Sequence, residues 1–223
     1  MNDNIENWDN IYKKKKSGSF LNYPSENLVT LFHQHKTYIN KNGNCLDYGF
    51  GSANNTEFLI QQISEVYGVE ISESSIEIAK ERLSKFHNFR PEKFTLANNE
   101  STFDNYFDTI VAWQMLYYND KNGLKESINK LHTYLKPKGV IFCTLTTQRD
   151  IKTIYAKPES ENTFVIDDRI PHQTGCLIYA PKSSDELLDL FSKFEVIDHG
   201  HFERISYQTR NAASEFYLIG QKK

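Results

Sequence analysis

Apolar runs of strand length alternate with segments of helical periodicity from Asn44 to about Phe194. This order is typical of a parallel sheet with helices on its faces. The strands that it predicts are Asn44–Tyr48, Glu65–Glu70, Lys93–Leu96, Phe107–Trp113 and Val140–Thr144. The helices that it predicts are Asn54–Gln62, Ser74–Phe86, Leu124–Leu135 and Ser184–Phe194.

The chain changes character after the last of these helices. Two aromatic-rich strands follow, Glu195–Phe202 and Glu215–Gln221, and the polar connection between them suits an antiparallel hairpin. The pattern therefore predicts an α/β fold, a doubly wound, seven-stranded, mostly parallel sheet with an antiparallel last strand. We expect Asn44–Tyr48 to lie centrally, Pro137 to end the helix before it, and Ser184 to cap the final helix.

Composition narrows the classes of function. The formal charge of −3 comes from 29 acidic and 26 basic residues spread along the chain, which argues against nucleic acid as a partner. The three cysteines show neither a disulfide framework nor zinc-ligand spacing, so we expect no metal. The N-terminus lacks the features of a signal peptide, and no apolar stretch approaches the ~20 residues of a membrane span. We therefore expect a cytoplasmic protein that does not bind membranes.

One glycine-rich stretch, CLDYGFGSANNTEFL, stands where the first predicted strand ends and a helix begins. Gly49 and Gly51 start the pattern of a nucleotide-binding turn, but the sixth position of a GxGxxG fingerprint is Asn54. A GxGxG pattern fits better, and it is incomplete by one methyl group at Ala53. Asp47, two residues before the first glycine, favours a ligand with an ammonium group over one with a pyrophosphate.

An acid stands at the end of the second predicted strand. Glu70 follows Gly51 by nineteen positions, and an acid at the carboxyl end of a strand can accept hydrogen bonds from both hydroxyls of a ribose. The alternative is a solvated strand-end residue, which is common for an isolated Glu. Position and spacing together favour the ribose interpretation.

These features resemble the first two motifs of the Rossmann-like (class I) S-adenosylmethionine-dependent methyltransferases of the small-molecule type. LANNESTFDNYFDTIVAWQMLYYND looks like the third and fourth motifs, and LKPKGVIFCT resembles the family's turn and fifth strand. The resemblance covers about Asn44–Lys223 and implies S-adenosyl-L-methionine as cofactor, with S-adenosyl-L-homocysteine as product. The cofactor-binding residues that it implies are Asp47, Gly49, Gly51, Glu70, Ile71, Asn98, Asn99, Trp113, Tyr12 and Tyr23.

Two positions depart from the family pattern. Ala53 replaces a glycine and leaves less room for the methionine carboxylate of the cofactor. Asn98 stands where many members place an Asp that accepts from the adenine amino group, so a charge-assisted hydrogen bond is lost. Both departures weaken the expected affinity without preventing binding.

The resemblance divides the single domain, residues 1–223, into four parts. Residues 1–40 form a helical extension whose Trp8, Tyr12 and Tyr23 could cover the cofactor, although ordinary packing against the domain is an equal alternative. Residues 44–146 form the cofactor-binding half, and 181–223 form a helix and the C-terminal hairpin. The insert at 147–180 is longer than a structural connection requires, so we expect it to contact the substrate.

Methyl transfer from a sulfonium requires mainly placement of the acceptor, together with a base when the acceptor is a hydroxyl. The candidate catalytic residues are His172, in the insert, and Tyr117, in the loop after the fourth strand. His172 would remove the proton, and Arg149 or Arg169 would orient an anionic or polar group. The alternative is a surface histidine, with the acids and arginines of the insert paired in solvent.

The expected reaction is methylation of a small polar acceptor, first of all at oxygen, in a sugar or a precursor of capsule or surface polysaccharide. YPSENLV, near the N-terminus, has a short resemblance to methyltransferases of surface-carbohydrate biosynthesis. N- or C-methylation of another small metabolite and a non-catalytic cofactor-binding module stay open, as do a monomer and a homodimer. A short-chain dehydrogenase fits less well because the YxxxK match precedes the glycine turn, and AWQM argues against methylation of nucleic-acid bases.

Overall fold

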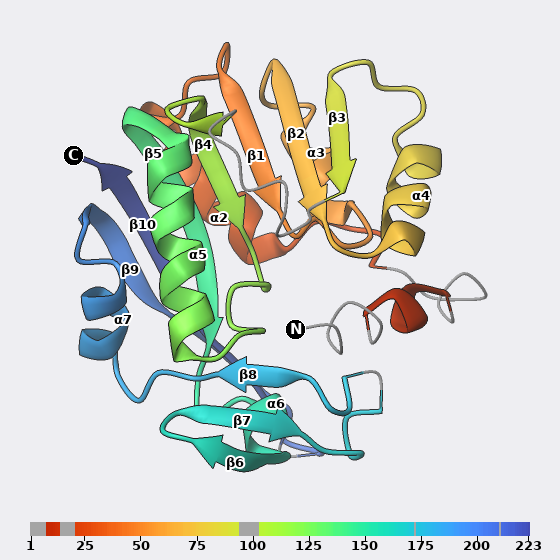
Figure 1. The fold of residues 1–223 in the computed structure, drawn as a ribbon, viewed down its shortest axis with the longest axis vertical. Helices are drawn as coiled ribbons and strands as arrows, with labels where there is room; N and C mark the ends of the chain where they lie inside the picture. The colour runs from red at the N-terminus through yellow and green to blue at the C-terminus, as the bar shows by residue number, and fades with distance from the viewer. Residues whose placement is uncertain (1–7, 14–20, 94–102, 172, 210) are drawn as a thin grey trace.

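The computed structural model describes residues 8–13, 21–93, 103–171, 173–209 and 211–223. Its main feature is a seven-stranded sheet with the order β3-β2-β1-β4-β5-β10-β9 (Figure 1). Pairing is parallel from β3 to β5, and β10 is antiparallel to both β5 and β9. The strands are β1 (Asn44–Tyr48), β2 (Glu65–Glu70), β3 (Phe89–Lys93), β4 (Phe107–Ala112), β5 (Leu135–Thr146), β9 (Phe194–Ile205) and β10 (Ala212–Lys222). The predicted fold class, with an interior β1 and an antiparallel last strand, is confirmed.

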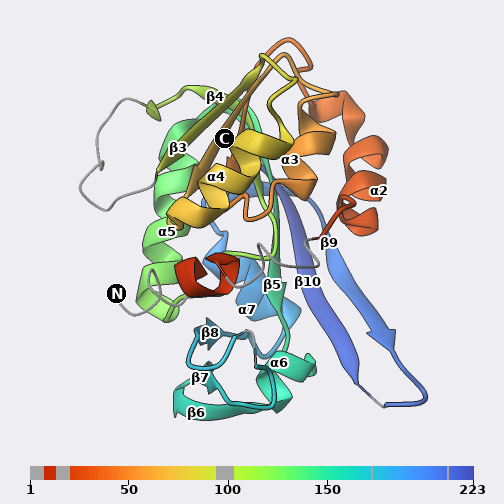
Figure 2. The same cartoon turned by 90° about the vertical axis from the view of Figure 1, so that its right-hand side faces the viewer.

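Helices cover both faces of this sheet, with α5 and α7 on one face and α2 and α3 on the other (Figure 2). A third helix, α4, contributes to the same core as α2 and α3, and a short 3-10 helix (Lys36–Tyr38) follows α2. None of the helices in the described ranges is long and apolar enough to cross a bilayer. The helices are α2 (Glu26–Gln34), α3 (Asn54–Leu59), α4 (Glu73–Arg82), α5 (Lys121–Tyr134) and α7 (Ser184–Leu190).

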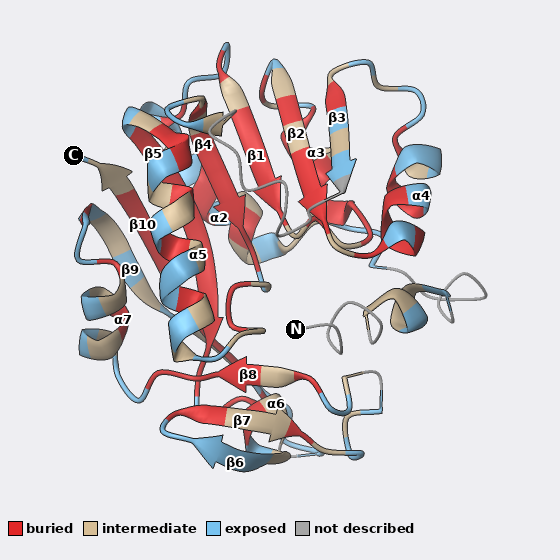
Figure 3. Ribbon diagram, viewed as in Figure 1, coloured by how far each residue is buried: buried red, intermediate tan, exposed pale blue. Residues whose placement is uncertain are grey.

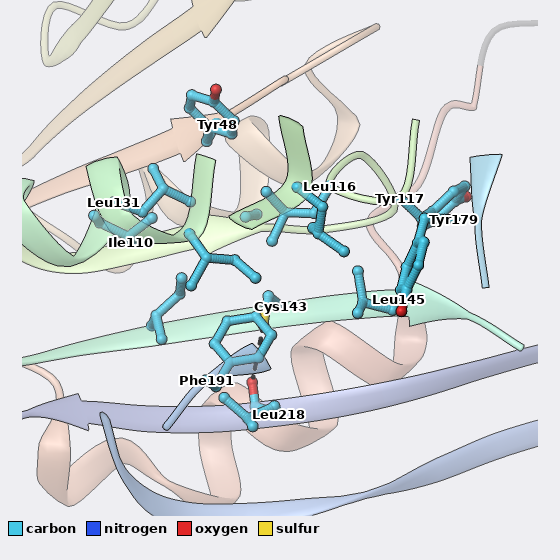
Figure 4. Close-up of a cluster of buried hydrophobic side chains, with 14 of the residues drawn as sticks. Tyr48, Ile110, Leu116, Tyr117, Leu131, Cys143, Leu145, Tyr179, Phe191 and Leu218 are labelled. Atoms are coloured by element: carbon cyan, nitrogen blue, oxygen red, sulfur yellow. Dashed lines mark hydrogen bonds between the residues drawn. The ribbon is translucent and has the colours of Figure 1, made fainter. Parts of the chain in front are cut away.

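Alternation along the interior strands builds two hydrophobic cores. In β4, Ile110 faces the α5 side and Val111 faces the α2 side, because successive side chains of a strand point to opposite faces. On α5, Leu124, Ile128 and Leu131 recur at helical spacing and are buried against the sheet; Leu131 is labelled in Figure 4. Each fully buried aliphatic side chain contributes about 1.5–3 kcal/mol, so the two cores fix the interior strands, which are mostly buried (Figure 3).

The start of β3 and the N-cap of α7 differ from the prediction. β3 begins at Phe89 rather than Lys93, and residues 94–96 of the predicted strand lie outside the described residues. β3 is an edge strand, paired with β2 on one side. An edge position tolerates the proline and the three charged residues of its sequence, FRPEK. The N-cap of α7 is Ser183, whose hydroxyl accepts a hydrogen bond from the Glu186 amide, and not the predicted Ser184.

Other boundaries differ by a few residues, up to five at the start of β5. α5 begins after Asp120, whose side chain accepts a hydrogen bond from the Gly123 amide, and it ends at Tyr134. The helix therefore stops before Pro137 as predicted, but β5 begins at Leu135, five residues before the predicted Val140. The two hairpin strands also extend beyond the predicted ranges at each end, and the hairpin projects from the sheet (Figure 2).

The insert at 147–180 contains regular structure that its sequence does not predict. It forms α6 (Ile151–Ile154) and a separate antiparallel sheet of β6 (Ala156–Ser160), β7 (Thr163–Ile166) and β8 (Leu177–Tyr179). This small sheet lies beyond the carboxyl ends of β4 and β5 (Figure 1). Tyr179 is buried beside Tyr117, and its amide donates a hydrogen bond to the Tyr117 carbonyl over 2.8 Å (Figure 4).

Asp108 joins three strands at the edge of the sheet opposite the glycine-rich turn. Its Oδ2 accepts hydrogen bonds from Lys136 Nζ (2.7 Å) and the Asn44 amide (3.0 Å), and its Oδ1 accepts one from Asn40 Nδ2 (3.0 Å). Burial alone would raise the pKa of this carboxyl. The three hydrogen bonds outweigh burial and lower the pKa below its ordinary value.

Replacement of Asp108 tests this junction. Asp108→Asn should lower the free energy of unfolding at pH 7 by about 1–3 kcal/mol, because hydrogen bonds to a charged group are lost or weakened. The lowered pKa means that the ionised form stabilises the fold above the ordinary value of about 4, and that this contribution disappears as the pH falls through the folded-state pKa. The difference between wild type and variant in urea unfolding should therefore shrink on acidification.

Asp189→Asn, the same change at an exposed carboxyl of α7, is the matched control. It should leave stability within about 0.5 kcal/mol of wild type. Equal effects of the two variants, or a difference at Asp108 that is independent of pH, would contradict the assigned role.

Candidate active site

The turn after β1 is held by a buried acid. Asp47 lies near the end of β1 with 2% of its surface exposed, and its Oδ2 accepts a hydrogen bond from Thr56 Oγ1 of α3 over 2.7 Å. Burial, assisted by the charge of Glu70, outweighs this hydrogen bond and raises the pKa of Asp47 to about 7. The carboxyl is therefore poised to ionise when a cation binds nearby.

Three alternate residues of this turn have left-handed backbone. Gly49 has φ +76°, Gly51 has φ +53°, and Ala53 has φ 60°. A Cβ atom at Gly49 would lie 2.8 Å from Cγ of Met115, so the turn also requires close packing there. An alanine in this conformation costs about 1–2 kcal/mol. Ala53 in place of the third glycine therefore adds backbone strain, in addition to the space that its methyl group takes from a ligand.

Glu70 joins this turn to the end of β2. Its carboxylate is 8% exposed, and Oε2 accepts a hydrogen bond from the Gly51 amide over 3.0 Å. Oε1 accepts from the amides of Ile71 (2.7 Å) and Ser72 (3.2 Å). Burial raises the pKa of Glu70 in spite of these three bonds. The predicted set Asp47, Gly51, Glu70 and Ile71 thus comes together at the carboxyl ends of β1 and β2.

The helical segment at residues 8–13 lies against this site (red in Figure 1). Asp9 Oδ1 accepts hydrogen bonds from Ser72 Oγ and the Ser74 amide, both over 3.0 Å. The Tyr12 hydroxyl lies so close to Gly51 that an added Cβ there would be 2.5 Å away, and burial, with the charge of Glu70, raises the pKa of Tyr12. The segment therefore covers the turn.

Two of the three aromatic residues predicted to cover the cofactor, Trp8 and Tyr12, lie in the segment at residues 8–13, and their covering role stays a prediction. Trp8 packs edge-on against Tyr118 with ring centroids 4.8 Å apart, and Tyr12 lies beside Trp8 at 6.2 Å. Tyr23 is 83% exposed, and only its carbonyl oxygen contacts the turn, as acceptor from Asn54 Nδ2. Its ring is thus largely open to solvent in the part of the chain that the structure describes.

Trp113 and Tyr117 lie in the loop after β4. Trp113 is buried in the core on the α2 side, and its Nε1 has no hydrogen-bond partner within the described residues. Tyr117 is buried beside Tyr118, with ring centroids 4.5 Å apart, and Lys152 Nζ lies 5.5 Å from its ring centroid. Burial raises the pKa of Tyr117 well above its ordinary value, so its phenol stays protonated near neutral pH and is poorly suited to act as a base.

Other predicted site residues are not brought to this edge, or fall outside what the structure describes. Asn98, Asn99 and His172 lie outside the described residues, so their assignments stay predictions. Arg149 pairs with Glu203 over 2.7 Å, and Arg169 pairs with Asp167 over 2.5 Å. The alternative of insert arginines paired with insert acids therefore describes Arg169, whereas Arg149 pairs with Glu203 of β9.

The sequence interpretation missed two polar residues near this edge, Gln114 and Glu215. Gln114 Nε2 donates to both carboxylate oxygens of Glu215, each over 3.0 Å. The available signal was an acid in the otherwise mainly apolar and aromatic strand SEFYLIG, where a charge requires a partner. The partner stands 101 positions away in the sequence, so spacing alone could not identify it.

The architecture is that of a Rossmann-like methyltransferase. A structure of an S-adenosylmethionine-dependent methyltransferase from Methanosarcina mazei has a TM-score of 0.70 and 20% identity, covering 84% of this chain and 95% of that one. One from Anabaena variabilis has a TM-score of 0.71 and 14% identity, covering 98% and 95%. A Burkholderia thailandensis 1,6-didemethyltoxoflavin-N1-methyltransferase with bound S-adenosylhomocysteine has a TM-score of 0.66 and 14% identity, covering 89% and 77%. At these identities the likeness concerns the fold.

A family model for a methyltransferase domain matches residues 21–212, and the chain therefore belongs to the methyltransferase-domain family. An uncharacterized methyltransferase from Anoxybacillus flavithermus is 31% identical over 62% of this chain and 64% of its own length. An uncharacterized RNA methyltransferase from Bacillus cereus is 26% identical over 70% of this chain and 35% of its own length. The chain thus spans less than two thirds of either curated relative. The family resemblance predicted from the motifs is confirmed.

Glu70→Ala tests the cofactor end of the site. It should weaken binding of S-adenosylhomocysteine by at least about 1 kcal/mol, or fivefold, because a ribose hydrogen bond and the anchor of the turn are removed together. Calorimetry measures the affinity, and Glu65→Ala at the start of the same strand is the control, with unchanged binding expected. A smaller effect at Glu70 would mean that the second motif is misplaced.

Proposed function

We propose that the chain transfers a methyl group from S-adenosyl-L-methionine to a small polar acceptor. The observation that carries this proposal is the meeting of Asp47, the left-handed turn at residues 49–53, and Glu70 at the carboxyl ends of β1 and β2. In an open α/β sheet this edge forms the ligand-binding crevice. Membership of the methyltransferase-domain family supports the same activity.

The chain offers a distinct group for each part of the cofactor. Glu70 accepts the ribose hydroxyls, and Ile71, Asn98 and Asn99 hold the adenine. The turn at residues 49–53 brings backbone close to the methionine part, where Asp47 is near enough to favour its ammonium group. Trp8 and Tyr12 shield the sulfonium, which gains from contact with aromatic faces and from exclusion of water.

The charge of Asp47 gives cofactor binding a dependence on pH. Its pKa of about 7 means that near pH 6 most of the free protein carries a neutral carboxyl. A bound ammonium group favours the ionised form, so affinity for S-adenosylhomocysteine should rise between pH 6 and pH 8, by up to about tenfold. Calorimetry across this range measures the effect. Asp47→Asn should abolish the dependence, and an unchanged pH profile in that variant would contradict the assignment.

The transfer itself is an in-line displacement at the sulfonium methyl. The nucleophile attacks the methyl carbon, the carbon–sulfur bond breaks, and its electron pair stays on sulfur to give neutral S-adenosylhomocysteine. An oxygen nucleophile also gives up a proton, which calls for a base. His172 stays the candidate base predicted from the sequence, whereas Tyr117 is better suited to orient an acceptor because its pKa is raised.

The favoured acceptor is a hydroxyl of a sugar or of a capsule or surface-polysaccharide precursor. The resemblance of YPSENLV to enzymes of surface-carbohydrate biosynthesis supports this choice. Methylation at nitrogen or carbon of another small metabolite is the second candidate reaction, and a non-catalytic cofactor-binding module is the third. We place the protein in the cytoplasm, as a monomer or homodimer, without nucleic acid or membrane partners.

Transfer of labelled methyl groups from S-adenosylmethionine tests these alternatives. The panel contains monosaccharides, nucleotide sugars and small amines, with a reaction lacking any acceptor as the control. We expect label in hydroxyl compounds, at turnover numbers of about 1 per second or less for a non-native panel member. Label only in amines would overturn O-methylation. Tight binding of S-adenosylhomocysteine without transfer to any acceptor would favour the non-catalytic module.

A further inference from the structure

Two buried polar side chains lie side by side where β5 ends. Glu215 of β10 is 8% exposed and is the direct partner of Thr146 of β5 in the antiparallel ladder; Thr146 is fully buried. Directly opposite residues of an antiparallel pair point to the same face of the sheet. A carboxylate and a hydroxyl therefore share one small region near the carboxyl ends of β4 and β5, beside the loop that contains Tyr117.

The hydrogen bonding of this pair is incomplete. Within the described residues, both oxygens of Glu215 accept from one donor atom, Gln114 Nε2, although a carboxylate offers about four acceptor sites. Thr146 Oγ1 is buried and has no hydrogen-bond partner within the described part of the chain. Buried polar groups are normally satisfied, and groups that are left unsatisfied at a sheet edge indicate a place for a polar ligand.

Gln114 connects this pair to the cofactor end of the site. Its backbone is left-handed, with φ 57°, and its amide donates to Thr144 Oγ1 over 2.9 Å. The next residue, Met115, packs directly against Gly49 of the turn. Non-glycine residues in this conformation carry strain that persists where the surrounding structure holds them, which is frequent at functional sites. The adjacent residues Gln114 and Met115 therefore link Glu215 to the turn at residues 49–53.

Among the described residues, the positive charge of Lys152 acts on Glu215, and Lys152 is itself paired with an acid. Its Nζ lies 3.0 Å from Asp150 Oδ1, while Asp150 Oδ2 accepts a hydrogen bond from the Ser214 amide over 2.8 Å. Asp150 therefore fixes α6 against β10 and holds Lys152 close to Glu215 without using its carboxylate. Burial raises the pKa of Glu215, and the charge of Lys152 opposes this effect. A carboxylate of this kind is a stronger base than one in water.

We propose that Glu215 accepts the proton of the acceptor hydroxyl, with Thr146 binding the same acceptor and Gln114 positioning the carboxylate. The inference rests on the proposed function and names the group that makes O-methylation possible. As the acceptor oxygen bonds to the methyl carbon, its proton passes to a Glu215 oxygen and the carbon–sulfur electron pair stays on sulfur. The products are a methyl ether, neutral S-adenosylhomocysteine and a protonated Glu215, which releases its proton to solvent.

The alternative is a structural carboxylate that only ties the loop after β4 to β10. Glu215→Gln separates the two roles, because glutamine keeps the shape and can still accept from Gln114 but has no basicity. If Glu215 is the base, the Glu215→Gln variant should have a kcat lower by about 10²-fold or more on the best hydroxyl acceptor of the panel. S-adenosylhomocysteine affinity and melting temperature should stay at the wild-type values. A purely structural role predicts instead a lower melting temperature or weaker S-adenosylhomocysteine binding, with kcat close to the wild-type value.

Further variants divide the site into its parts. Thr146→Val should raise KM for the acceptor several-fold with little change in kcat, since it removes a binding contact only. Gln114→Leu, at an exposed position, should lower kcat about tenfold while cofactor affinity is retained, and it serves as the second test if Glu215→Gln does not fold. Glu195→Gln, the same change at an exposed position of β9, is the matched control and should behave as wild type.

The experiments distinguish failure of the inference about Glu215 from failure of the proposed function. If wild type methylates hydroxyl acceptors and Glu215→Gln retains kcat within threefold, the inference is overturned and the proposed function stands. A 10²-fold loss in His172→Ala alone would likewise overturn the inference and would assign the base to the insert. If wild type binds S-adenosylhomocysteine but methylates no hydroxyl in the panel, the proposed acceptor class is wrong and the inference falls with it.

Discussion

The rest of the site depends on the hydrogen bonds that the Glu70 carboxylate accepts. By accepting hydrogen bonds from the amides of Gly51, Ile71 and Ser72, it joins the turn after β1 to the end of β2. Left-handed backbone at three alternate positions is costly unless its surroundings hold it, and this buried acceptor supplies a fixed partner. The geometry of the turn is therefore set by the protein itself before any ligand arrives, as preorganised binding requires.

The whole edge is acidic and aromatic, which suits a positively charged ligand. Asp47 and Glu70 lie at one end of it, and Asp150 and Glu215 lie at the other. Burial, with neighbouring charges, raises the pKa values of the tyrosines between them, Tyr12, Tyr117 and Tyr118. In such poorly hydrated surroundings, a sulfonium gains more from nearby carboxylates and aromatic faces than it would in water. Loss of that positive charge on methyl transfer then weakens the attraction for the product.

How far the sequence predicts this molecule depends on whether the relevant signal is local. β1 and β2 match their predicted ranges because each is an apolar run bounded by turn residues. In the insert's small sheet, β6 escaped prediction because its exposed sequence, AKPES, carries no apolar alternation, and β7 and β8 are only four and three residues long. The contact between Gln114 and Glu215 escaped for another reason: it joins residues that only the tertiary fold brings together.

The small sheet of the insert is structurally separate from the turn at residues 49–53 and from Glu70. Its strands pair among themselves and not with the main sheet in the part of the chain that the structure describes. Glu70, the turn at residues 49–53 and α4 make their hydrogen bonds elsewhere. Amino-acid changes within β6 and β7 therefore leave the hydrogen bonds of Glu70 and of the turn unchanged. Under the proposed function, the segment expected to contact the acceptor can therefore change in evolution independently of the part that holds the methyl donor.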